Sequence, residues 1–310
     1  MYLHRPSTVI SLLFAVYSFG CAGGKNGGSE SGTCDNASAD GYQTISEGDV
    51  TREYILHLPS GYDANNNEGY PLIISFHGNG GCAGAFGSGS YVGDGLSDLS
   101  PQADANNFIV AYPQGVAREK GGTEWDPGDN GSTNINDNDV YFTQQLVADI
   151  SSNHLIDSTR TYAVGYSNGG MMAYGLACTL GSQIAAVGIM SGIMLEGTCT
   201  ETDHTPVIHF HGTADDALPY DGNTEFQSVA NVISFWVSHN QITETTPTTT
   251  TFNNGQVTLD SYTGGAEGSS VQLYTIEGGG HVWFDQAIDG ESPSDILWNF
   301  LSGYDLNGSL

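Results

Sequence analysis

A serine enclosed by glycines follows an apolar run near the middle of the chain. The stretch reads Gly165-Tyr166-Ser167-Asn168-Gly169-Gly170, directly after Tyr162-Ala163-Val164. A serine hydroxyl is a weak nucleophile, and hydrolases activate it on a tight exposed turn beside a base, where glycines permit a strained backbone. The pattern alone is weak evidence, because a chain with 43 glycines matches it readily by chance. Ser167 is therefore a candidate nucleophile whose assignment depends on its surroundings.

Candidates for the acid and the base come later in the sequence. Asp215 follows the apolar segment 207–210, and His281 follows the segment 273–276 and a run of glycines. The order serine, aspartate, histidine, each beyond a predicted strand, is that of α/β-hydrolases and differs from the orders in the two common serine protease folds. We therefore expect Ser167 to attack, His281 to accept its proton, and Asp215 to orient the imidazole.

The charge that develops on the attacked oxygen needs backbone N–H donors. In an α/β-hydrolase one donor belongs to the residue after the nucleophile, here Asn168, and another comes from a loop after an earlier strand. That loop reads His77-Gly78-Asn79-Gly80-Gly81, and its glycines would let the backbone approach a substrate closely. We nominate Asn79 as the second donor. We interpret His77 as a structural histidine, because His281 already fills the position of the base.

The elements that must hold these residues alternate between strand and helix. The fully apolar segment 72–76 is typical of the middle of a parallel sheet covered on both faces. Asp137 is a candidate helix cap, and the Thr-rich stretch 243–251 before Asn253-Asn254-Gly255 predicts a strand pair with a turn. Strands are expected at 52–58, 72–76, 108–112, 160–164, 184–190, 206–210 and 271–276, and helices at 137–154, 171–177, 226–239 and 294–301. We predict an α/β-hydrolase fold over residues 34–310, with a mostly parallel central sheet and helices on both faces.

Several motifs together resemble the secreted polyhydroxybutyrate-depolymerase-like and feruloyl esterase family. They are Gly165 to Met171, His211-Gly212-Thr213-Ala214-Asp215 with Pro219-Tyr220, and Gly279-Gly280-His281 with Trp283. The resemblance implies a carboxyl-ester hydrolase acting on feruloyl or acetyl esters of plant polysaccharide, or on a polyester. Tyr141, Val282 and Phe284 replace residues usual in the family, which leaves the substrate open.

Asp216 is an alternative to Asp215 as the acid. Neighbouring side chains of an extended segment point to opposite sides, so only one of the two faces His281. We favour Asp215, because its spacing from His211 and Pro219 is the one found in the family. His209 and His211, two residues apart, would chelate a metal only with a third ligand, and the sequence shows none.

The first residues predict export. Residues 1–20 carry Arg5, a short apolar run and small residues before Cys21, which is typical of a removed signal peptide and too short for a membrane-spanning segment. The Gly/Ser-rich stretch 21–33 predicts a flexible tether. Cys21 is a candidate lipid anchor of a bacterial surface lipoprotein, and ordinary cleavage without lipidation is the alternative.

The other cysteines form an even set suited to disulfides in an oxidising compartment. Three pairings are open, and we favour Cys178 with Cys199 and Cys34 with Cys82, since each would tie a loop near the candidate site. Buried free thiols are the alternative. The spacing does not fit a zinc site.

The net charge of −29 argues against binding to nucleic acid or to an anionic membrane surface. A calcium ion in the Asp-rich stretch 129–139 is weakly indicated, because its spacing fits no EF-hand. We expect no cofactor and no metal. The oligomeric state is left open.

Substrate contacts are the hardest to place. Trp125 and Trp283 are candidates for an apolar wall against an aromatic acyl group or a sugar, and ordinary packing is the alternative for both. The expected partner is a small-molecule or polysaccharide-linked ester. A short-chain polyester is the alternative substrate, and a non-catalytic surface-binding protein on a hydrolase scaffold is the alternative function.

Overall fold

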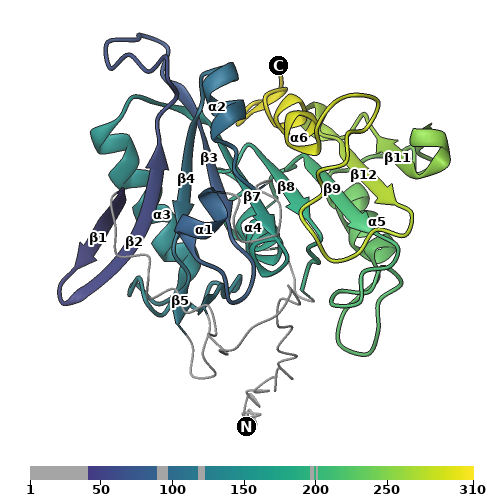
Figure 1. Cartoon of the computed structure of the whole chain (residues 1–310), viewed down its shortest axis with the longest axis horizontal. Helices are drawn as coiled ribbons and strands as arrows, with labels where there is room; N and C mark the ends of the chain where they lie inside the picture. Colours follow the sequence, from purple (N-terminus) through teal and green to yellow (C-terminus); the bar gives the residue numbers. More distant parts are fainter. Residues whose placement is uncertain (1–40, 89–96, 118–122, 196–198, 200–201) are drawn as a thin grey trace, which may run out of the picture. The chain divides into compact units, whose positions relative to one another are not determined.

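The described part of the chain is built on one ten-stranded sheet. The computed structural model describes residues 41–88, 97–117, 123–195, 199 and 202–310. The sheet runs from β1 on the left of Figure 1 towards β11 on the right. In spatial order its strands are β1 (Tyr42–Glu47), β2 (Val50–His57), β4 (Ile109–Pro113), β3 (Tyr70–Phe76), β7 (Ile156–Tyr166), β8 (Ala186–Met190), β9 (Val207–Gly212), β12 (Val271–Ile276), β11 (Val257–Tyr262) and β10 (Thr248–Phe252).

The centre of this sheet is parallel and its two margins are antiparallel. Neighbours from β4 through β3, β7, β8 and β9 to β12 pair in parallel. Antiparallel pairing joins β1, β2 and β4 on one side and β12, β11 and β10 on the other. The other strands of the described residues form two small ribbons, β5 (Val116–Ala117) with β6 (Thr123–Glu124) and β13 (Tyr304–Asp305) with β14 (Gly308–Ser309). The predicted mostly parallel α/β sheet is confirmed.

Helices cover both faces of the sheet. They are α1 (Ala83–Gly87), α2 (Ser100–Asn106), α3 (Asp139–Asn153), α4 (Asn168–Thr179), α5 (Val229–His239) and α6 (Pro293–Leu301). Alternate residues of a strand point to opposite faces, so Leu72 and Ile74 of β3 join a core with α3, α4 and α5, whereas Ile73 joins a second core with α1, α2 and α6. Both faces of the central strands are therefore buried, which explains why 72–76 is apolar throughout.

Two local expectations differ in detail from the structure. The cap of α3 is Asn138 and not Asp137, because the Asn138 side chain accepts hydrogen bonds from the N–H groups of Val140 and Tyr141. The Thr-rich stretch does form the predicted strand pair, with a turn at Asn253–Gly255, but pairing begins only at Thr248. Both shifts are small, since the ends of elements are the part of a fold that local sequence determines least.

The predicted Cys178–Cys199 disulfide is present and ties the end of α4 to the segment after β8. The predicted signal peptide at 1–20, the tether at 21–33 with Cys21, and the proposed Cys34 partner of Cys82 lie outside the described residues. Within the described ranges, every helix is too short or too polar to cross a membrane.

Arg52 fixes the loop that precedes α3. Its guanidinium, which is buried, donates to the Asp139 carboxylate at 2.7 Å and to the backbone carbonyls of Ile135 and Gln114 at 2.7 and 2.9 Å. It also lies over the Phe142 ring, 3.7 Å from the centroid. The other Asp139 oxygen accepts from the N–H of residue 126. One buried ion pair therefore joins β2, the 125–139 loop and α3.

We expect Arg52→Met to destabilise the fold by about 3–5 kcal/mol, because it leaves the buried Asp139 carboxylate without its charge partner. Urea unfolding of the two proteins measures the difference. Arg160→Met is the matched control, since its partner Asp157 lies three residues away and both side chains are partly exposed, where an ion pair contributes at most about 1 kcal/mol. Equal losses for the two variants would contradict this assignment.

Candidate active site

Ser167 occupies the turn between β7 and α4. Its backbone has φ 54° and ψ −118°, a conformation that is strained for any residue with a side chain. The Ser167 N–H donates to the carbonyl of Met190 at the end of β8, at 2.9 Å. The strain and this anchor hold the hydroxyl at the carboxyl end of the sheet, as the sequence pattern predicts.

The glycines around Ser167 are required by close backbone contacts. A Cβ atom on Gly165 would lie 2.0 Å from the carbonyl oxygen of Gly169, and one on Gly169 would lie 2.1 Å from that of Phe76. Neither distance is compatible with a side chain, and the obstacles are main-chain atoms that cannot turn away. Packing of the turn against β7 and β3 therefore accounts for both motif glycines.

The structure brings Ser167, His281 and Asp215 into one hydrogen-bonded chain. The Ser167 Oγ lies 2.9 Å from His281 Nε2, and His281 Nδ1 lies 2.8 Å from Asp215 Oδ2. The other oxygen, Asp215 Oδ1, accepts from the N–H groups of Ala217 and Leu218 at 3.0 and 2.8 Å. This arrangement can remove a proton from a serine hydroxyl and stabilise the imidazolium that results.

Three parallel strands deliver these residues to one edge of the sheet. Ser167 follows β7, Asp215 lies beyond β9, and His281 lies beyond β12. The last two loops are tied together, because the N–H of Thr213 donates to Ile276 and that of Ala214 to Gly279, both at 2.9 Å. The His281 side chain is 17% exposed whereas that of Asp215 is fully buried, so solvent reaches the histidine and not the carboxylate.

The geometry distinguishes Asp215 from its neighbour. Asp216 is exposed, while Asp215 is buried and directed at His281. A turn in which Asp215 Oδ1 caps the N–H groups of Ala217 and Leu218 sets this direction. Of the two aspartates, Asp215 is therefore the one whose carboxylate contacts His281.

The region expected to bind an oxyanion borders Ser167. Asn168 is the first residue of α4, so its N–H has no partner within the helix. The loop after β3 passes close by, since a Cβ atom on Gly78 would lie 3.3 Å from that of Ser167. Asn79 follows Gly78 in this loop and is exposed. Both nominated donors therefore belong to segments that flank the nucleophile.

His77 is a structural histidine in this loop. Its Nδ1 donates to the carbonyl of Gly78 at 2.8 Å, and its Nε2 accepts from the N–H of Gly115 at 3.0 Å. Burial lowers the pKa of His77 to about 4, so the ring is neutral near pH 7, as this pair of hydrogen bonds requires.

Both candidate substrate tryptophans are buried. Trp125 is 3% exposed, its indole N–H donates to the carbonyl of His77, and its ring packs edge-on against Phe76. Trp283 is 2% exposed and packs edge-on against Phe86. Neither ring offers a face on which an acyl group or a sugar could stack, so packing accounts for both positions.

Trp125 nevertheless contacts the site through its backbone. Its N–H donates to the Asn168 side-chain oxygen at 2.7 Å, and its carbonyl accepts from the Asn168 amide at 3.1 Å. This two-way contact joins the start of α4 to the loop that Arg52 holds. The sequence gives no signal of it, because the two residues are 43 positions apart.

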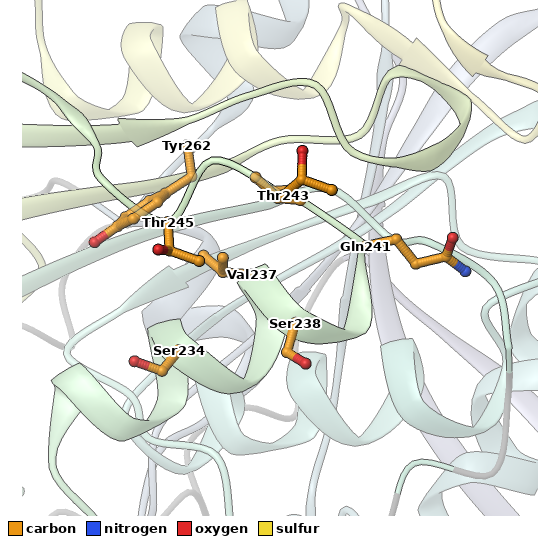
Figure 2. Close-up of a pocket in the computed structure, with 8 residues that line it drawn as sticks. Ser234, Val237, Ser238, Gln241, Thr243, Thr245 and Tyr262 are labelled. Carbon is orange, nitrogen blue, oxygen red and sulfur yellow. The ribbon is translucent and has the colours of Figure 1, made fainter.

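A cavity of about 350 Å³ lies away from this chain of residues, between α5 and the segment that follows it (Figure 2). One of its lining residues, Tyr262, pairs with Val271 at the start of β12, whereas His281 lies beyond the end of that strand. The lining hydroxyls of Ser238 and Thr243 point in different directions in Figure 2. The cavity is therefore separate from the candidate active site.

The His, Cys, Asp and Glu side chains of the described ranges form no group of three or more that could hold a metal ion. In the Asp-rich stretch 129–139, the Asp129 carboxylate accepts hydrogen bonds from the N–H of Gly131 and from the Asn138 side chain. These hydrogen bonds stabilise the loop itself.

Comparison with known sequences identifies the family. The family model described as "Esterase PHB depolymerase" matches residues 52–242, which is more than half of the chain and includes Ser167 and Asp215. The chain belongs to this esterase family. The match ends before His281, so the proposed role of this histidine depends on the geometry described above.

The chain is similar to a probable feruloyl esterase C from Aspergillus niger, 32% identical over 56% of this chain and 58% of that protein. A feruloyl esterase B from Piromyces equi is 28% identical over 82% of this chain and 46% of its own length. The chain thus spans about half the length of these two relatives. Among solved structures, an acetyl xylan esterase from Aspergillus awamori has a TM-score of 0.60 at 16% identity, covering 85% of this chain and 99% of that one. This likeness confirms the α/β-hydrolase fold.

Proposed function

We propose that this protein is a serine carboxylesterase that hydrolyses feruloyl-type or acetyl-type esters carried by plant polysaccharide. Membership of the esterase family supports the class of reaction. The observation that carries the mechanism is the hydrogen-bonded chain from Ser167 through His281 to Asp215. The names of the two fungal relatives support the feruloyl substrate class.

In the proposed reaction the Ser167 oxygen attacks the ester carbonyl while His281 Nε2 takes the hydroxyl proton. The imidazolium is stabilised by Asp215 and returns that proton to the leaving alcohol, which leaves an acyl group on Ser167. Water, deprotonated by the same histidine, then releases the acid. The N–H groups of Asn168 and Asn79 are the proposed donors to the oxyanion, and one such donor contributes about 3–4 kcal/mol in a serine protease of a different fold.

We also propose that the protein acts outside the cell. The Cys178–Cys199 disulfide is consistent with an oxidising compartment, and the sequence of residues 1–20 is typical of a signal peptide. In this account residues 21–33 are a tether and residues 34–310 form the hydrolase domain.

A polyester substrate is the second candidate, because the matching family model is described as a PHB depolymerase. The two functions share the same chemistry at Ser167 and differ in the acyl group that the site accepts. Substrate preference therefore separates them, while the presence of Ser167-dependent turnover does not.

The test is a panel of methyl ferulate, p-nitrophenyl acetate, p-nitrophenyl butyrate and a hydroxybutyrate oligomer, assayed with wild type and Ser167→Ala. We expect serine-dependent kcat/KM to be highest for methyl ferulate or the acetate. A preference for the oligomer would establish the polyester function instead. Absence of serine-dependent turnover on every ester would refute both and favour a non-catalytic binding protein.

A further inference from the structure

A chain of buried polar side chains lies behind Asp215. The Tyr174 hydroxyl of α4 lies 2.7 Å from His209 Nδ1, and His209 Nε2 lies 3.0 Å from His211 Nδ1. His211 Nε2 then lies 2.8 Å from the carbonyl oxygen of Leu218 and 3.3 Å from Asp215 Oδ2. Tyr174 and both histidines are fully buried, and the proposed mechanism uses none of them.

One arrangement of the hydrogen atoms accounts for these four contacts. A carbonyl only accepts, so His211 Nε2 carries the hydrogen that it donates to Leu218. Burial lowers the pKa of both His209 and His211 and raises that of Tyr174, so both rings are neutral and the hydroxyl keeps its proton. His211 Nδ1 therefore accepts from His209 Nε2–H, and His209 Nδ1 accepts from the Tyr174 hydroxyl.

This chain ends on the turn that holds the acid. His211 binds the carbonyl of Leu218, and the N–H of Leu218 donates to Asp215 Oδ1. His211 Nε2 also faces Asp215 Oδ2, the oxygen that accepts from His281. Both carboxylate oxygens are thus restrained by groups that His211 contacts directly or through Leu218.

We infer that Tyr174, His209 and His211 are positioning residues, which hold the Asp215 carboxylate in the orientation that His281 requires. The inference rests on the proposed function for its catalytic consequence. An apolar pair on this face of β9 would fill the core without needing hydrogen bonds, whereas the polar chain leaves a buried donor or acceptor unpaired if any member is lost. Through this chain of hydrogen bonds, the position of α4 helps to fix the orientation of the Asp215 carboxylate.

The test compares Tyr174→Phe with Tyr162→Phe, two substitutions that each remove one buried tyrosine hydroxyl. The Tyr162 hydroxyl donates to the carbonyl of Tyr304 and belongs to the core on the other face of the sheet, so it is a matched control. We expect Tyr174→Phe to lower kcat on p-nitrophenyl acetate about 3- to 10-fold with KM within twofold. We expect His211→Gln to lower it about 10- to 100-fold, by analogy with the loss of residues that orient the ligands of a metal site. Tyr162→Phe should leave kcat unchanged while shifting the unfolding temperature by a similar amount.

A second readout does not require turnover. The proton between His281 Nδ1 and Asp215 gives a far-downfield proton NMR resonance when that hydrogen bond is well formed. We expect this resonance to shift or broaden in Tyr174→Phe and not in Tyr162→Phe, even if wild type fails to hydrolyse the esters and the proposed function is wrong. Equal kcat values and equal spectra for the two tyrosine variants would overturn the positioning role.

Discussion

Replacing Ser167 with alanine is expected to lower kcat for ester hydrolysis by about 10⁶-fold, as removal of the nucleophile does in a serine hydrolase whose triad acts as a unit. The chain should still fold, because alanine keeps the Cβ atom and the backbone anchor to Met190 does not involve the side chain. Steady-state assays on the preferred ester measure the loss, and thermal unfolding checks the fold.

Ser97→Ala is the control for the Ser167 result. The Ser97 side chain is buried and donates to the carbonyl of Phe86 at 2.7 Å, so the substitution removes a serine hydrogen bond that lies outside the Ser167–His281–Asp215 chain. We expect its kcat to stay within about twofold of wild type, with a loss of stability of about 1 kcal/mol. Retention of full activity in Ser167→Ala would show that another residue is the nucleophile.

Asp215→Asn is expected to lower kcat by about 10⁴-fold, the loss seen when the acid of a serine triad becomes an amide. The asparagine amide would donate to His281 Nδ1 and fix the ring in the tautomer that carries its hydrogen on Nε2, which then cannot accept the Ser167 proton. Measurement of kcat for Asp215→Asn and for wild type, together with urea unfolding of both proteins, separates this effect from a loss of folding.

Asp216→Asn is the matched control, because it makes the same change one residue away on an exposed side chain. We expect its kcat to remain within about twofold of wild type. If Asp216→Asn were the more damaging substitution, the acid would be Asp216 and the hydrogen bond between His281 and Asp215 would have no catalytic role.

Much of the candidate site follows from sequence order alone. In a parallel sheet the loops after β7, β9 and β12 meet at one edge, so a serine, an aspartate and a histidine placed after those strands are brought together by topology. The glycines around Ser167 are likewise visible in the sequence, although the contact that excludes a side chain at Gly169 is with Phe76 of β3, far away in the chain. The order of these motifs and the strands before them can be read directly from the sequence.

Other features depend on contacts between side chains far apart in the chain. The Arg52 guanidinium reaches partners 83 and 87 positions away, and no local pattern marks it as buried. The burial of Trp125 and Trp283 likewise cannot be read from the sequence. A tryptophan close to a site residue in the sequence can line an open pocket or pack in the core. The structure shows that Trp125 packs against Phe76 and that Trp283 packs against Phe86.

His209 and His211 also have partners that the sequence does not reveal. Their spacing places both on one face of a strand, which the sequence reveals, and suggests a metal when the third partner is unknown. The structure supplies Tyr174 from α4 and the carbonyl of Leu218 as the missing partners. An apparent ligand pair is therefore a hydrogen-bonded chain directed at Asp215.

The most direct test of the central claim is to treat the protein with diethyl p-nitrophenyl phosphate and map the adduct by mass spectrometry. An activated serine displaces p-nitrophenol and keeps the diethylphosphoryl group, so the reaction reports the nucleophile without assuming a natural ester. We predict one adduct per chain, on the peptide that contains Ser167, and none in Ser167→Ala or in a denatured sample. An adduct on a different residue, or none in a preparation that hydrolyses esters, would contradict the assignment of Ser167 as the nucleophile.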